Sequence, residues 1–159
     1  HERIVCCEDT LELRIANENH VRLLEDPVNG IRLPELVAFS LRLRPDRIVC
    51  GEARGAEALH LIGAFHTGHP GFGSLHADSA RGVFSRLEQM MRLAGRDAPS
   101  SALRSEIAQA VDVIVFIDAP YDAMTKSRTR FILEVLRVHD YENEEFKTET
   151  VYSAYGAAD

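Results

Sequence analysis

Three residues that could carry out hydrolytic chemistry each follow, or lie within, a short apolar segment. They are Glu8 after residues 3–7, Glu52 after residues 48–50, and His76 within residues 73–77. If these segments are parallel strands, their carboxyl ends meet at one edge of a sheet, where open α/β folds keep their ligand crevice. Two carboxylates and an imidazole at such an edge can position a water molecule and sense a phosphate group. The pattern therefore predicts a site for phosphoanhydride hydrolysis.

Arginines bracket the Glu52 segment. Arg42, Arg44 and Arg47 precede it, and Arg54 follows it. An arginine near a catalytic edge can stabilise a transferred phosphate, from the same subunit or across an interface. The alternative is that Arg–Asp pairs, such as Asp46 with a neighbouring arginine, hold a loop in place. For each arginine the sequence leaves both interpretations open.

The histidines allow a competing interpretation as a zinc hydrolase. His66, His69 and His76 could bind Zn²⁺, with Glu8 or Asp78 as a further ligand. His66 and His69, however, lie where a helical pattern breaks, so they do not share one rigid face. The simpler interpretation is that each is a polar residue closing a helix or lining a loop.

A lysine loop for nucleotide phosphates is missing from the sequence. The Gly-x4-Gly-Lys-Ser/Thr pattern needs a lysine directly after a glycine-rich turn. The only lysines are Lys126, which has no glycine nearby, and Lys147, which lies in a predicted strand. We therefore expect that this chain alone cannot hold the β- and γ-phosphates of a nucleotide in the usual way.

Composition and length favour one domain with a sizeable core. The 159 residues are 45% hydrophobic, and the net charge of −7 argues against a general binder of nucleic acid or acidic membranes. Cys6, Cys7 and Cys50 lie in apolar segments, which favours small core residues over a disulfide framework. No apolar run has the length of a membrane span. The chain starts without Met, directly before a strand, so we expect it to be a piece of a longer protein.

Hydrophobic periodicity predicts an alternation of strands and helices. Such alternation favours an α/β fold with a mostly parallel sheet and an antiparallel addition at the end. The expected strands span residues 3–7, 20–24, 47–51, 73–77 and 111–117, followed by an antiparallel pair at 130–140 and 146–153. The expected helices span residues 33–43, 56–65, 79–94 and 100–110.

Three ordered segments of the chain resemble sequence boxes of the type II/type IV secretion traffic ATPases, and most closely those of Trb-type conjugal-transfer ATPases. Residues 3–13 resemble the acidic box, residues 42–58 the Walker B region and residues 67–80 the histidine box. The resemblance implies a RecA-like P-loop NTPase core that hydrolyses ATP with Mg²⁺. It also implies a hexameric ring, cytoplasmic at the inner face of the inner membrane, that powers conjugal transfer, type IV secretion or pilus assembly.

The resemblance implies a role for each matching residue. Glu52 would act on the attacking water, and Glu8 and Asp9 would help to place water and the water shell of Mg²⁺, without binding the metal directly. His76 would approach the γ-phosphate. Direct contact with nucleic acid is not expected, and association with the membrane is expected to be peripheral only.

Two arginines would act across a subunit boundary according to the same resemblance. Arg44, and less directly Arg42, would contact phosphates there. The Walker A loop and the N-terminal domain, which the family carries upstream of the acidic box, are absent from the sequence. Residues 1–159 are therefore expected to be a partial C-terminal ATPase domain that is inactive alone. The alternative is a catalytically silent assembly or interaction module.

Overall fold

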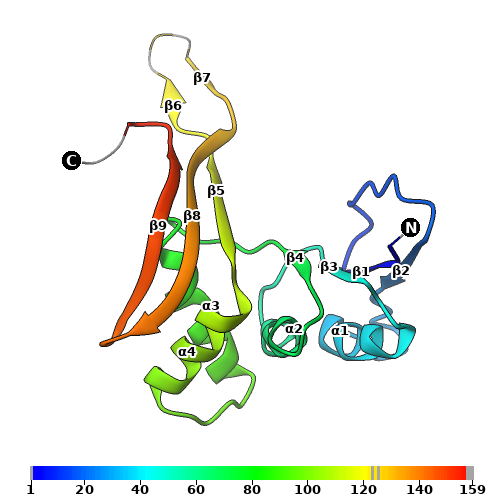
Figure 1. Ribbon diagram of the computed structural model, residues 1–159. Helices are drawn as coiled ribbons and strands as arrows, with labels where there is room; N and C mark the ends of the chain where they lie inside the picture. Colours follow the sequence, from blue (N-terminus) through cyan, green and yellow to red (C-terminus); the bar gives the residue numbers. More distant parts are fainter. Residues whose placement is uncertain (1, 123, 125, 157–159) are drawn as a thin grey trace.

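Two β-sheets and a shared layer of helices make up the fold (Figure 1). The computed structural model describes residues 2–122, 124 and 126–156. The first sheet is parallel, with the strand order β2-β1-β3-β4, and contains β1 (Ile4–Glu8), β2 (His20–Leu24), β3 (Arg47–Cys50) and β4 (Gly71–Gly73). The second sheet is antiparallel, with the order β5-β8-β9, and contains β5 (Val113–Asp118), β8 (Phe131–Glu142) and β9 (Glu145–Ser153). A short hairpin of β6 (Tyr121–Asp122) and β7 (Ser127–Arg128) stands beyond the second sheet.

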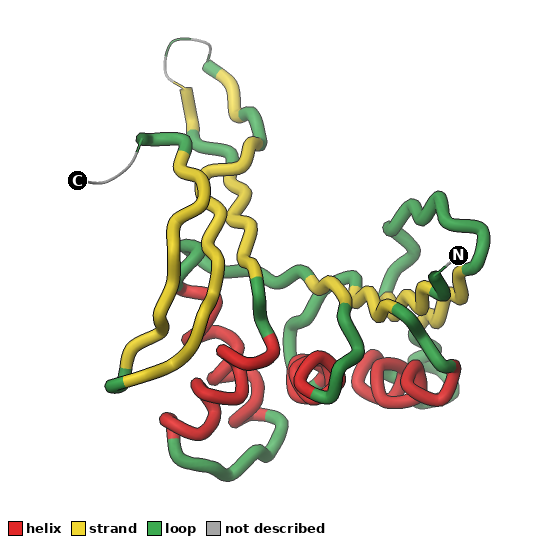
Figure 2. Tube along the Cα trace, viewed as in Figure 1, coloured by secondary structure: helices red, strands yellow, loops and turns green. Residues whose placement is uncertain are grey.

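Helices cover one side of each sheet (Figures 1 and 2). Against the parallel sheet lie α1 (Leu33–Ser40), which continues into a 3₁₀ turn at Leu41–Leu43, and α2 (Glu57–His66). Beside the antiparallel sheet lie α3 (Gly82–Leu93) and α4 (Ser100–Ala110). Because α2 packs against both α1 and α4, it joins the two halves of the molecule.

Each half has its own hydrophobic core. Under the parallel sheet, every second strand side chain packs against α1 and α2, as the two-residue period of a strand requires. This core includes Val5, Cys7, Ile48 and Cys50 from the strands, Val37 from α1 and Leu61 from α2. The other core lies between α3, α4 and the antiparallel sheet, and includes Phe84, Met90, Leu103, Ile107, Ile114 and Leu136. The expected burial of the cysteines is confirmed.

Two of the buried thiols are expected to be chemically unreactive in the native chain. Burial raises the pKa of Cys7 to about 12, and burial likewise raises the pKa of Cys50 to about 12. Because the thiolate is the reactive species, we expect neither cysteine to react with iodoacetamide at pH 8 in the native chain. Mass spectrometry after alkylation, with and without urea, measures this. Rapid alkylation of Cys7 or Cys50 without denaturant would contradict the burial seen here.

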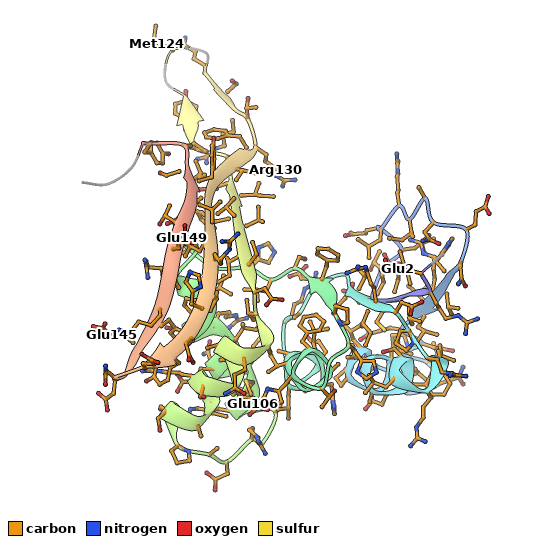
Figure 3. All side chains as sticks on the ribbon, in the orientation of Figure 1. Glu2, Glu106, Met124, Arg130, Glu145 and Glu149 are labelled. Atoms are coloured by element: carbon orange, nitrogen blue, oxygen red, sulfur yellow. The ribbon has the colours of Figure 1, made fainter. Side chains whose placement is uncertain are left out.

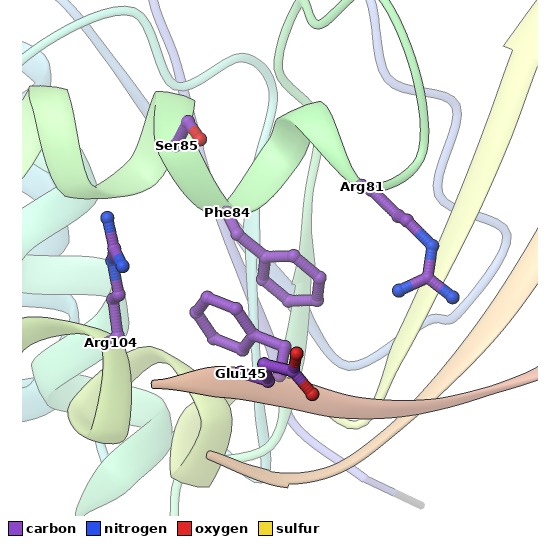
Figure 4. Close-up of a pocket in the computed structure, with 6 residues that line it drawn as sticks. Arg81, Phe84, Ser85, Arg104 and Glu145 are labelled. Carbon is purple, nitrogen blue, oxygen red and sulfur yellow. The ribbon is translucent and has the colours of Figure 1, made fainter. Parts of the chain in front are cut away.

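The closing antiparallel pair forms as the sequence predicted. Asn143 and Glu144 link β8 to β9 with positive φ angles of 53° and 64°, which suits a tight two-residue hairpin. Next to this turn, the rings of Phe84 and Phe146 stack at 3.8 Å. The stack borders an open hollow of about 500 Å³ (Figure 4), lined by Arg81, Phe84, Ser85, Arg104, Glu145 and Phe146.

Two predicted boundaries differ from the structure. The expected helix over residues 33–43 ends as α1 at Ser40, and the turn after it closes at Arg44, whose φ of 52° is left-handed and stops helical hydrogen bonding. The expected helix over residues 79–94 begins only at Gly82. Ser79 still helps to start it, because its hydroxyl accepts the N–H of Gly82 at 3.0 Å.

The fourth strand of the parallel sheet lies earlier than predicted. We expected residues 73–77, but β4 spans Gly71–Gly73. A Cβ on Gly71 would lie 1.9 Å from the carbonyl oxygen of Ile48 and 2.7 Å from the ring of Phe65. The pairing with β3 therefore requires a glycine at this position. Hydrophobic periodicity does not detect a strand made of two glycines and one phenylalanine.

A pair of glycine substitutions tests this close approach. We expect Gly71→Ala to destabilise the chain by about 3 kcal/mol, because the methyl group must displace backbone rather than a flexible side chain. Gly63→Ala, within α2 and with no atom within 4 Å of the added Cβ, should instead stabilise the chain by about 1 kcal/mol. Urea unfolding followed by circular dichroism measures both. Equal midpoints for the two variants would contradict the β3–β4 geometry.

The surface of the described residues is rich in charged side chains. Glu145 and Glu149 project from β9, and Glu2 lies in the half of the molecule that contains the parallel sheet (Figure 3). Within the described residues, none of the helices combines the length and the apolar character that crossing a membrane requires.

Candidate functional site

The carboxyl ends of β1 and β3 lie side by side, as the sequence predicted. Cys7 pairs with Cys50, so Glu8 and Gly51 are the next residues at the same edge of the sheet. The N–H of Gly51 donates to the carbonyl of Cys7 at 2.9 Å, and a Cβ on Gly51 would lie 3.3 Å from Cγ of Glu8. These contacts hold the loop that carries Glu52 against the carboxyl end of β1.

The two oxygens of Glu52 have different surroundings. Oε2 accepts a hydrogen bond from Arg54 Nη2 at 2.7 Å. Oε1 lies 3.3 Å from Nε2 of His76, but it is buried and has no hydrogen-bond partner among the described residues. The hydrogen bond from Arg54 lowers the pKa of Glu52, and this outweighs the opposing effect of burial. At neutral pH the carboxylate is ionised, with Oε2 bound by Arg54 and Oε1 enclosed beside His76 with its capacity to accept a hydrogen bond unused in the described residues.

The loop that leads to His76 is tied to the Glu52 loop. The N–H of Ala53 donates to the carbonyl of Ser74 at 2.7 Å, and the Ser74 hydroxyl donates to the carbonyl of Gly51 at 2.5 Å. These bonds bring His76 to Glu52 although its own side chain is 91% exposed. An open hollow of about 810 Å³ continues from His76 along α3, lined by His76, Ala77, Asp78, Gly82, Ser85, Arg86 and Gln89.

Glu8 is buried at the end of β1, with only 1% of its side chain exposed. Its Oε1 accepts the N–H groups of Glu12 at 2.9 Å and Leu13 at 2.7 Å, and its Oε2 accepts two hydrogen bonds from Arg22, at 3.1 and 3.2 Å. Burial alone would raise the pKa of Glu8, but these hydrogen bonds hold it below its ordinary value. In this structure both oxygens anchor the loop after β1, and a role in placing water or Mg²⁺ stays a prediction.

Asp9 joins the site through Arg54. Its Oδ2 accepts a hydrogen bond from Arg54 Nη1 at 3.0 Å, while the other terminal nitrogen of Arg54 binds Glu52. We call Asp9, Glu52, Arg54 and His76 the edge cluster. The sequence had placed Arg54 only among the arginines near the strand, because the bridge between two loops that are 45 positions apart becomes visible only in the fold.

Arg42 and Arg44 lie near the amino end of β3, opposite to the carboxyl end that carries Glu52. Both precede β3, whereas Glu52 follows it, and both are exposed. Within one subunit the strand therefore separates them from the edge cluster. A contact with phosphate across a subunit boundary stays a prediction.

The structure does not gather a metal centre from the histidines. His66 closes α2 and His69 precedes β4, whereas His76 follows β4 at its other end. Among the residues that the structure describes, no group of three His, Cys, Asp or Glu side chains is placed to hold a metal ion. The zinc interpretation of His66, His69 and His76 is therefore wrong.

Comparison with known proteins gives a consistent match along nearly the whole chain. A family model described as type II/IV secretion system protein matches residues 1–149. The chain is 37% identical to the conjugal transfer protein TrbB of Rhizobium radiobacter over 150 residues, which is 93% of the chain and 42% of TrbB. It is 37% identical to VirB11 of Agrobacterium fabrum over 121 residues, 72% of the chain and 35% of that protein. The chain thus spans less than half the length of these relatives.

A solved structure shows the same fold. The VirB11 ATPase from the Brucella suis type IV secretion system, solved in complex with sulphate, superposes with a TM-score of 0.74 and 32% identity, over 84% of this chain and 39% of that one. The expected RecA-like α/β fold, with a mostly parallel sheet and antiparallel C-terminal strands, is confirmed. The matched family model, the conjugal-transfer relative and this structure agree. This chain belongs to the type II/IV secretion system protein family.

Proposed function

We propose that this chain is the C-terminal motor part of an ATPase that powers conjugal transfer or type IV secretion. The observation that carries the proposal is the ionised Glu52 carboxylate, whose Oε1 lies 3.3 Å from Nε2 of His76 and has no hydrogen-bond partner among the described residues. Its relatives support the assignment, because they include a conjugal transfer protein and a VirB11 ATPase. A pilus-assembly motor is a further system of the same kind.

The edge cluster suits the hydrolysis of a phosphoanhydride. Oε1 of Glu52 orients the attacking water and accepts its proton, and His76 is close enough to contact a terminal phosphate placed beside it. Bound ATP with Mg²⁺ supplies the reactive phosphate and neutralises its charge. Asp9, whose side chain is 31% exposed at this edge, is the carboxylate that would hold the water shell of the ion, whereas both oxygens of Glu8 already accept hydrogen bonds.

We propose that the loop that binds the nucleotide phosphates lies outside residues 1–159. The sequence has no lysine loop, and the chain spans 42% of its TrbB relative. In the described sheets, β4 pairs only with β3 and β5 only with β8, and Phe72, the central residue of β4, is 66% exposed. Free strand edges are normally covered. We propose that an upstream segment pairs with the free edge of β4 and brings the phosphate-binding loop to the edge cluster.

The working assembly is a ring in our proposal. Arg42 and Arg44, at the edge opposite Glu52, would face the nucleotide of the next subunit in a hexamer. The ring would act in the cytoplasm, at the inner face of the inner membrane, together with the secretion or conjugation machinery. No direct contact with nucleic acid is part of the proposal.

Calorimetry separates the motor from a silent module. The parent protein, meaning the longer protein that we propose contains this chain, should bind Mg²⁺–ATP and release phosphate, whereas residues 1–159 alone should do neither. If the parent protein binds no ATP and releases no phosphate, the chain is instead an assembly or interaction module. Tight binding of ATP by residues 1–159 alone would contradict the proposed upstream grip.

A further inference from the structure

Arg54 connects two loops that arise from different strands of the parallel sheet. Its guanidinium donates to Asp9 Oδ2 at 3.0 Å, after β1, and to Glu52 Oε2 at 2.7 Å, after β3. A planar guanidinium fixes the direction of both bonds, which a single ammonium group does not. The bridge therefore sets the rotation of the Glu52 carboxylate relative to the edge of the sheet.

The backbone of Arg54 is anchored by the side chain of Glu57. Glu57, the first residue of α2, is only 6% exposed, and its Oε1 accepts the N–H of Gly55 at 2.6 Å and the N–H of Arg54. A buried carboxylate that accepts two N–H groups at a helix start is a rigid anchor. The exposed end of Arg54 thus extends from a fixed base.

The bridge makes the two oxygens of Glu52 unequal. Oε2 is occupied by Arg54, so Oε1, which lies 3.3 Å from Nε2 of His76 and has no hydrogen-bond partner in the described residues, is left as the oxygen that can accept a proton. We propose that Arg54 is a positioning residue, which holds Oε2 of Glu52 so that Oε1 faces the attacking water. This inference rests on the proposed ATPase function, and it adds a residue that does not itself touch the phosphate.

The test compares variants of the parent protein by steady-state hydrolysis of ATP. We expect Arg54→Gln to lower kcat about 30-fold, because a Glu52 carboxylate that is no longer held in position accepts the proton of the attacking water less efficiently. The Kd for ATP should stay within about 2-fold of the wild type, since both terminal nitrogens of Arg54 are bound to Asp9 and Glu52. Arg54→Lys keeps the charge and one bond to the carboxylate, so it should recover at least about a third of the wild-type kcat.

Arg96→Gln is the matched control. The side chain of Arg96 is 50% exposed, compared with 64% for Arg54, and it binds the carboxylate of Glu106 on α4 at 3.3 Å. It should leave kcat within about 2-fold of the wild type, as expected for a surface ion pair outside the edge cluster. A crystal structure of the nucleotide-free Arg54→Gln variant gives a readout that does not depend on turnover, and it should show the Glu52 carboxylate rotated.

Single-turnover rates decide whether Arg54 acts through Glu52. The double variant Glu52→Gln/Arg54→Gln should be no slower than Glu52→Gln alone, because the base that Arg54 orients is already gone. Multiplied losses, an unchanged kcat in Arg54→Gln, or a parallel loss of ATP affinity would each overturn the inference. An inactive wild-type parent protein would instead refute the proposed function, so the two failures are distinguishable.

Discussion

Glu52→Gln in the parent protein is expected to lower ATP turnover by at least about 100-fold, while ATP binding survives. The amide keeps the shape of the side chain and can still accept a bond from Arg54, but it cannot take a proton from the attacking water. Phosphate release gives kcat, and titration calorimetry gives the Kd for ATP. The loss should therefore appear in kcat and leave the Kd within a few-fold of the wild type.

Glu106 provides the control for this substitution. Its side chain is 21% exposed and pairs with Arg96 at 3.3 Å, which closely matches the 20% exposure of Glu52 and its pairing with Arg54. Glu106 lies on α4, away from the edge cluster, so Glu106→Gln should leave turnover unchanged. Normal turnover in Glu52→Gln, or an equal loss in both variants, would exclude Glu52 as the general base.

Glu8→Gln is expected to destabilise the chain by about 3 kcal/mol. The carboxylate is almost fully buried and accepts four hydrogen bonds, two from backbone N–H groups and two from Arg22. An amide offers one oxygen in place of two, and its NH₂ group must face either a donor or the guanidinium. Breaking one side of a buried ion pair costs about 3–5 kcal/mol. Urea unfolding at pH 7 measures the loss.

Glu2 is the control for Glu8. It makes a two-point ion pair with Arg47, but its side chain is 52% exposed, so Glu2→Gln should leave the urea midpoint close to that of the wild type. If Glu8→Gln were as mild as Glu2→Gln, Glu8 would not be the anchor of the loop after β1. A large loss of stability would separate this structural role from any role in placing water.

The pH dependence of stability follows from the same residue. Hydrogen bonds hold the pKa of Glu8 in the folded state below its ordinary value of 4.5, whereas the unfolded chain keeps the ordinary value. As the pH falls through 4.5, the unfolded state takes up the proton first, so stability decreases with falling pH. The stabilisation is fully present above about pH 5.5 and is lost towards the lower folded pKa. Glu8→Gln should therefore flatten this acid limb.

The sequence alone determined the order of the elements, except for the β6–β7 hairpin, and it brought Glu8, Glu52 and His76 to one end of the parallel sheet. Hydrophobic runs ending in Glu8 and Glu52 were sufficient to place both residues at one edge of a parallel sheet, because side-chain period and strand polarity are local properties. The sequence boxes identified the family, which the comparisons confirmed. The two-residue turn at Asn143 and Glu144 was equally local, since it lies in a run of polar residues that includes Asn143, a residue type that tolerates positive φ.

The tertiary structure decided which contacts these residues make. Only the fold shows that both oxygens of Glu8 accept hydrogen bonds from Arg22 and the following loop, and that Arg54 bridges Asp9 to Glu52. It also moved β4 to Gly71, where backbone approach and not hydrophobicity fixes the strand. Hydrogen-bond pairing between loops from different strands depends on distances through space, which residue types and spacing along the chain do not encode.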